Sequence, residues 1–302
     1  MNYEEIPLTF DCEGSTLVGM IHRPERIRGR GVLAIVAGGP QYRGGVGRLQ
    51  VQLARTLAAA GVPVMRFDYR GLGDSDGRFR GFEDVGTDLA AAARAFRSHV
   101  PGMDSIVLWG GCDAASGIMI NAWRMPEVSG LMIGNPWVHS DETGDAVTVK
   151  HHYRKRMLER DFWLKVVRLQ YNPLPALLVL GRSVLSRVRR KLAASSAPAG
   201  KTVDERSLPF VERMRLGMSR FNGDILLLLS GRSMVSKEFD ELLSNDAGWR
   251  QAMASARSLD RHDMPDADQT YSSIAARNEV IGIAQTWLLE REPADDRQRA
   301  CA

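Results

Sequence analysis

The stretch Leu108–Ser116, LWGGCDAAS, decides the fold. A buried-strand pattern, SIVLWGG, ends at Gly111, and a helical pattern begins at Asp113. Cys112 therefore lies at the tip of a tight turn between a strand and a helix, and the residues two positions before and after it are small. A nucleophile held on a strained strand-to-helix turn requires such small neighbours. The pattern predicts Cys112 as the nucleophile of an enzyme; a buried cysteine in an ordinary turn is the alternative.

The helix that follows Cys112 would affect the chemistry of this side chain. The N-terminal end of a helix carries a partial positive charge and lowers the pKa of a nearby thiol. We therefore expect a thiolate at Cys112, with the backbone N–H of Asp113 as one donor of an oxyanion hole. The loop Ala37–Pro40, which ends an earlier strand, would supply a second donor from Gly38 or Gly39, because glycines allow the backbone to approach a substrate.

Strand and helix patterns alternate on both sides of this turn. Two N-terminal strands surround the turn at Glu13–Ser15, and buried strands follow at GVLAIVAGG, VPVMRF, SIVLWGG and VSGLMIG. Further along the chain the strand patterns GDILLLLSG and SLDRHD follow, and a final helix is expected from Ser272 to Leu289. This alternation predicts an α/β fold, a mostly parallel sheet with helices on both faces.

The alternation of strand and helix patterns stops after the sixth strand. Residues 139–218 contain basic and aromatic segments of helical type without a strand pattern. We therefore expect a core of residues 1–138 and 219–291, a mainly helical basic cap of residues 139–218 inserted after the sixth core strand, and a flexible tail of residues 292–302. A lid over the pocket is the first interpretation of the cap.

Charge is concentrated in that predicted cap. The 302 residues carry a net charge of +4, but Lys150–Lys191 alone carries +10, which leaves −6 elsewhere. This distribution argues against a nucleic-acid-binding protein and suggests peripheral contact of the cap with an anionic membrane or an acidic partner. Three widely spaced cysteines and the lack of an apolar leader favour the cytoplasm. No cofactor or metal site is expected.

Four motifs together resemble the exosortase A system-associated hydrolase 1 family: VAGGPQYRGG, RFDYRGLGDSDG, LWGGCDAAS and HHYRKRMLERDFW. The likeness runs from about Leu8 to Leu289. It implies a bacterial, cytoplasmic protein of the α/β-hydrolase fold with a cysteine nucleophile, linked to exopolysaccharide and PEP-CTERM protein-sorting loci.

The chain departs from the family pattern where a cysteine nucleophile needs a base and an acid. The resemblance places a histidine where Gln269 stands, and Ser233 occupies the place of the acid after the seventh strand. His262 is the remaining candidate base, provided that it reaches Cys112, and a surface histidine is its alternative role. Asp240 or Glu238 is the candidate acid.

The residues support two hypotheses. The first is a hydrolase that acts on an ester or thioester through Cys112. The second is an impaired pseudohydrolase that binds an acyl ligand or a partner in the same system. Loss of the base would slow deacylation, because general-base help contributes about 10²–10⁴-fold.

Overall fold

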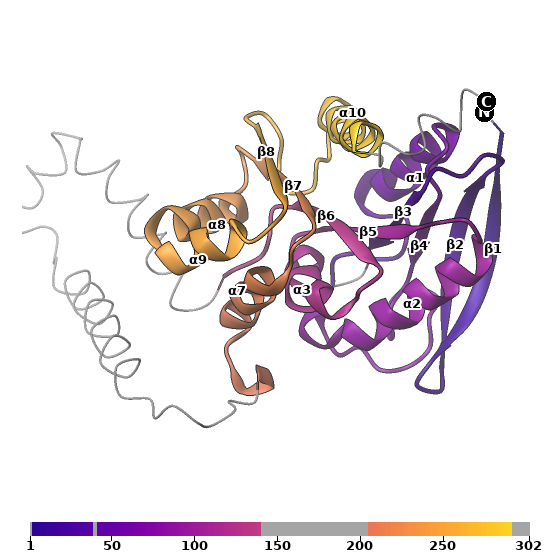
Figure 1. Ribbon diagram of the computed structural model, residues 1–302, viewed down its shortest axis with the longest axis horizontal. Coiled ribbons are helices and arrows are strands. Elements are labelled where there is room, and N and C mark those ends of the chain that lie inside the picture. The colour runs from indigo at the N-terminus through magenta and orange to yellow at the C-terminus, as the bar shows by residue number, and fades with distance from the viewer. Residues whose placement is uncertain (1, 39–40, 140–204, 292–302) are drawn as a thin grey trace, which may run out of the picture. The chain divides into compact units, whose positions relative to one another are not determined.

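The computed structural model describes residues 2–38, 41–139 and 205–291 (Figure 1). The chain separates into two compact units, Met1–Trp137 with Pro209–Ala302, and Val138–Leu208. The first unit contains the sheet and the turn that carries Cys112. Most of the predicted cap (residues 140–204) and the predicted tail (residues 292–302) lie outside the described residues.

The sheet of the first unit has eight strands in the order β1-β2-β4-β3-β5-β6-β7-β8. β1 and β2 form an antiparallel hairpin, β2 pairs antiparallel with β4, and the remaining neighbours are parallel. The strands are β1 (Tyr3–Cys12), β2 (Ser15–Pro24), β3 (Arg30–Ile35), β4 (Val64–Phe67), β5 (Ser105–Gly111), β6 (Val128–Gly134), β7 (Asp224–Ser230) and β8 (Ser258–Met264).

Helices cover both faces of the sheet (Figure 1). They are α1 (Leu49–Ala59), α2 (Gly86–His99), α3 (Asp113–Asn121), α7 (Phe210–Arg220), α8 (Met234–Asn245), α9 (Ala247–Met253) and α10 (Ile274–Glu290), with short 3-10 turns at Val46–Arg48, Phe82–Asp84, Ala122–Arg124 and Glu205–Ser207. Strands β3, β4 and β7 are buried at every residue, as expected of parallel strands covered on two sides. The predicted α/β fold with a mostly parallel sheet is confirmed.

One apolar layer joins α1 and α10 to the sheet. Leu53 and Leu57 of α1 and Val280 and Trp287 of α10 belong to one buried cluster with residues of six strands, β3 to β8. On the opposite face lie α2, α3 and α7 (Figure 1). Burial of these stripes of apolar side chains fixes the helices, and α3 in particular begins directly at the turn that carries Cys112.

Helix α7 belongs to the core unit, whereas the predicted cap boundary at residue 218 falls inside this helix, two residues before its end. The helix packs against α3, and Gly217 allows the contact because an added Cβ would lie 2.0 Å from the backbone oxygen of Met119. Met214 and Met218 of the same helix are fully buried. The helical pattern alone does not distinguish a helix that covers the sheet from one in an insertion.

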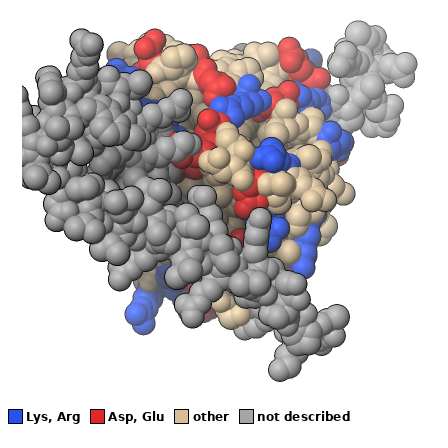
Figure 2. Space-filling model, turned by 90° about the vertical axis from the view of Figure 1, so that its left-hand side faces the viewer, with Lys and Arg blue, Asp and Glu red and all other residues tan. Residues whose placement is uncertain are grey.

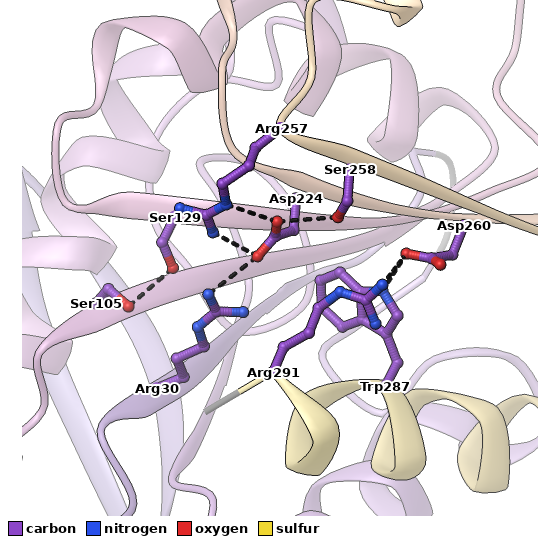
Figure 3. Close-up of polar contacts among 9 residues, drawn as sticks. All are labelled: Arg30, Ser105, Ser129, Asp224, Arg257, Ser258, Asp260, Trp287 and Arg291. Atoms are coloured by element: carbon purple, nitrogen blue, oxygen red, sulfur yellow. Dashed lines mark hydrogen bonds and ion pairs between the residues drawn. The ribbon is translucent and has the colours of Figure 1, made fainter. Parts of the chain in front are cut away.

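The amino ends of the strands are joined by a buried ionic cluster (Figure 3). Asp224, at the start of β7, accepts hydrogen bonds from Arg30 (3.0 Å), Arg257 (2.8 and 2.5 Å) and Ser258 (2.9 Å). Burial raises the pKa of Asp224, but these donors outweigh burial and lower it to about 2. Cys112 lies at the opposite, carboxyl edge of the sheet, so the cluster stabilises the fold without belonging to the site.

Charged side chains of both signs are interspersed on the described surface (Figure 2). The basic segment 150–191, which carries the predicted membrane or partner contact, lies outside the described residues. Within the part of the chain that the structure describes, no helix is long and apolar enough to cross a membrane.

Candidate active site

Cys112 occupies a strained turn between β5 and α3. Its φ is 55° and its ψ −127°, a left-handed region that residues with a side chain rarely adopt. The turn is held from both sides, because the Cys112 N–H donates to the Gly134 carbonyl (2.8 Å) and the Cys112 carbonyl accepts from Trp137 N–H (3.2 Å). A Cβ at Gly110 would lie 2.8 Å from Ile118 Cδ1, which explains the small residue there. The geometry is that of a nucleophile elbow.

A cavity of about 290 Å³ lies at this turn. Its lining combines residues from the elbow, the loop after β3, the start of α1 and the loop after β8: Ala37, Gly38, Gln41, Gly45, Val46, Leu49, Gln50, Phe82, Trp109, Gly111, Cys112, Asp113, Trp137, Gln269, Thr270 and Tyr271. Most of this surface is apolar, which suits the acyl part of an ester. The few polar groups are therefore the ones that orient a ligand.

Gln269 stands beside the thiol. Its Nε2 donates to Cys112 Sγ at 3.2 Å, within the distance over which a base would accept a proton from the thiol. The side chain of Asn135 fixes the loop by donating to the Gln269 carbonyl (2.8 Å), and Tyr271 donates its hydroxyl to the Leu228 carbonyl (3.1 Å). An amide cannot accept a proton at neutral pH. Gln269 can therefore orient the sulfur but cannot activate it or a water molecule.

The structure does not bring the other candidate base and acid to Cys112. His262 lies inside β8 opposite Leu228, is exposed, and is absent from the residues that line the cavity. Asp240 is on α8 and binds Arg261 (2.6 Å) at the surface. The alternative acid, Glu238, is buried in the same helix and does not line the cavity.

Ser233 serves as a helix cap. Its side chain accepts from Ser236 N–H at 3.3 Å and thereby begins α8. The side chain is buried, and the neighbouring Arg232 N–H donates to the Ala267 carbonyl, two residues before Gln269. The position after the seventh strand thus lies against the loop of Gln269, but a hydroxyl stands where the triad needs a carboxylate.

The sequence predicted a lowered pKa for the Cys112 thiol, and this prediction is wrong. Burial raises the pKa of the Cys112 thiol, and the carboxylate of Asp113 raises it further, because both disfavour a second negative charge in the pocket. Hydrogen bonds from Gln269 and the Asp113 N–H act in the opposite sense without reversing the result. The pKa of the Cys112 thiol is therefore raised, although the start of α3 lies beside it.

This raised pKa has a direct consequence for alkylation. We expect the rate of iodoacetamide modification of Cys112 to follow an apparent pKa above the value of about 8.5 for a free thiol. Mass spectrometry of the Cys112 peptide over a pH series would measure it separately from Cys12 and Cys301. A profile that levels off below neutral pH would mean that the helix end outweighs burial and the Asp113 carboxylate.

One of the predicted oxyanion donors, Gly38, is already occupied. The backbone N–H of Gly38 donates to both carboxylate oxygens of Asp113, at 2.9 and 3.0 Å. The other glycine of the predicted pair, Gly39, lies outside the described residues. The predicted oxyanion hole involves only the backbone of Asp113, but the Asp113 side chain also takes part in the site.

Three residues of the site escaped the sequence analysis. Asn135 is fully buried, with a φ of 47°, and its amide also donates to Ser230 Oγ (2.8 Å). Asn135 directly follows β6, at the same sheet edge as Cys112. A polar residue at the carboxyl end of a predicted parallel strand could have indicated this position from the sequence. Trp137 and Tyr271 line the cavity, and only the fold places them there. In the described ranges, no group of three or more acidic, histidine or cysteine side chains could hold a metal ion.

Comparison with known proteins gives the fold. No family model and no curated protein sequence matches the chain. Among solved structures, an esterase from Pyrococcus furiosus has a TM-score of 0.60 at 14% identity and covers 97% of this chain and 92% of its own. Est1E from Butyrivibrio proteoclasticus, with ferulic acid bound, has a TM-score of 0.57 at 13% identity, with 94% and 98% covered. A lidless α/β serine hydrolase from Xanthomonas campestris has 0.54 at 15%, with 97% and 98% covered. The chain has the α/β-hydrolase fold.

Proposed function

We propose that the protein acts on an ester or thioester through Cys112 and releases the acyl group slowly. The observation that carries this proposal is the elbow itself: a thiol on a left-handed turn, beside an apolar cavity and one hydrogen bond from Gln269. A strained backbone at such a position persists where the surrounding structure imposes it, and that strain is characteristic of functional sites. The esterases among the structural neighbours support the same reaction class.

The first step is acyl transfer to sulfur. Cys112 Sγ attacks the carbonyl carbon, the carbon–sulfur bond forms, and the bond to the leaving alcohol or thiol breaks with the electron pair on the leaving group. The thiol proton passes to solvent. In the second step water attacks the thioester. No histidine lines the described part of the cavity, and Gln269 cannot take the proton. The acyl-protein is therefore the species that accumulates.

Intact-mass spectrometry with p-nitrophenyl butyrate tests the proposal. We expect one butyryl adduct on the native chain, formed with release of nitrophenolate and lost slowly. The Cys112→Ala variant should form none, while Cys12→Ala, at a buried thiol outside the cavity, should behave like the native chain. No adduct on the native chain, or an adduct that survives Cys112→Ala, would overturn the proposal.

A second function is favoured by the occupied oxyanion donors. If the Asp113 carboxylate keeps the Gly38 N–H, the pocket binds an acyl ligand without transferring it. The protein would then be a pseudohydrolase that binds its ligand or a partner. The resemblance to the exosortase-associated family would place either function in exopolysaccharide synthesis or protein sorting, with the cap against the inner membrane. Ligand binding without an adduct in the same mass experiment would favour this second function.

A further inference from the structure

The Asp113 side chain lies where the negative charge of a reacting substrate would form. Its carboxylate accepts from the Gly38 N–H through both oxygens (2.9 and 3.0 Å), and the backbone N–H groups of Ala114 and of Asp113 itself also stabilise its charge. In this fold the N–H after the nucleophile and an N–H from the loop after β3 form the oxyanion hole. The carboxylate thus uses the same donors as a tetrahedral intermediate.

The loop after β3 is shaped to admit this carboxylate. A Cβ at position 38 would lie 2.6 Å from Asp113 Oδ2, closer than real contacts allow, so only glycine permits the approach. Asp113 is largely enclosed, and burial raises its pKa against the lowering effect of its three N–H donors. The contact is therefore a built part of the pocket, formed between residues 75 positions apart.

Tyr69 offers a second place for the carboxylate. Its side chain is 3% exposed, and its hydroxyl has no hydrogen-bond partner. A buried hydroxyl without a partner is unfavourable. The hydroxyl lies 3.4 Å from the same Cβ point at Gly38 that lies 2.6 Å from Asp113 Oδ2. The ring is stacked on Phe79, with 6.0 Å between the centroids. Burial raises the pKa of the Tyr69 hydroxyl, and the charge of Asp113 contributes to the rise.

We propose that the Asp113 carboxylate is an internal occupant of the oxyanion hole, that a substrate carbonyl must displace it, and that the Tyr69 hydroxyl receives it when displaced. This inference rests on the proposed acyl transfer to Cys112. Asp113 then limits the rate of acylation by occupying the oxyanion hole. Tyr69 is a positioning residue, because its hydroxyl holds the displaced carboxylate. A substrate enters the hole only when it offers a better acceptor for the Gly38 N–H than the chain's own carboxylate.

Two reactions of the same thiol separate this role from a simple charge effect. Acylation by p-nitrophenyl butyrate needs the thiolate and the oxyanion hole, whereas alkylation by iodoacetamide needs only the thiolate. We expect Asp113→Ala to raise the ratio of the acylation rate to the alkylation rate by about 10-fold or more, since single oxyanion donors contribute about 10²–10³-fold. Asp113→Asn should change this ratio less, because an amide oxygen still accepts from Gly38.

Tyr69→Phe tests the displaced position independently, with a change that removes one oxygen. It should lower the same ratio several-fold and leave alkylation unchanged. Equal rises of both rates in Asp113→Ala would show that the carboxylate acts only on the thiol's charge and would overturn the inference, as would an unchanged ratio in Tyr69→Phe. Absence of acylation in every variant, with alkylation intact, would instead overturn the proposed function and the inference with it.

Discussion

The double variant Gln269→His with Ser233→Asp is expected to turn over p-nitrophenyl butyrate about 10²–10⁴ times faster than the native chain. Gln269 already places a nitrogen 3.2 Å from Cys112 Sγ, and an imidazole has the same reach but can accept a proton. Ser233 caps α8, and aspartate is an equally good cap, so the substitution keeps the start of the helix. The backbone hydrogen bond from Arg232 to Ala267 holds the loop of residue 233 against the loop of residue 269, so the introduced acid and base lie on neighbouring loops.

Steady-state nitrophenol release measures the gain, and intact mass shows its cause. The acyl adduct should become short-lived in the double variant, because deacylation is the step that lacks a base. Gln269→Asn is the matched control, because its amide cannot accept a proton and its side chain is shorter. The rate of nitrophenol release should not increase in this variant. A double variant that folds, forms the adduct and retains it as long as the native chain would show that the missing base is not what slows release.

The architecture was predictable because periodicity reports burial directly. The apolar patterns GVLAIVAGG, SIVLWGG and VSGLMIG predicted buried parallel strands. The strands observed there end at Ile35, Gly111 and Gly134, and all three ends lie at one edge of the sheet. The small residues around Cys112 predicted the turn because they are a steric requirement of it. Gln269 was also singled out from the sequence, because the family resemblance implies a histidine at its position.

The electrostatics of the site were not predictable in the same way. The helix end favours a thiolate, but burial and the Asp113 carboxylate oppose it, and the sum depends on distances of about 3 Å. Those distances depend on a side-chain rotamer and on a glycine 75 positions earlier in the chain. Local patterns carry no information about such a contact, and for the same reason they assigned roles to His262 and Asp240 that their positions in β8 and α8 do not suit.

Asp224→Ala is expected to reduce the free energy of unfolding by about 3–5 kcal/mol, the usual cost of breaking a buried ion pair. Asp224 and Arg30 are both buried, and 194 positions of sequence separate them, so the pair joins the two ends of the core (Figure 3). Without the carboxylate, the buried charge of Arg30 loses the ion-pair partner that it has among the described residues. Asp263→Ala, which breaks an exposed pair with Arg261, is the matched control and should cost less than about 1 kcal/mol.

Urea unfolding as a function of pH identifies the carboxylate as the source of this stability. The pKa of Asp224 is about 2 in the folded chain, below its unfolded value, so its contribution is complete above about pH 4 and is lost as pH falls towards 2. The difference in unfolding free energy between native and Asp224→Ala chains should therefore shrink by about 2 kcal/mol across that interval. A difference that stays constant from neutral to acid pH would mean that the alanine acts through lost packing, and that the charge of Asp224 contributes nothing.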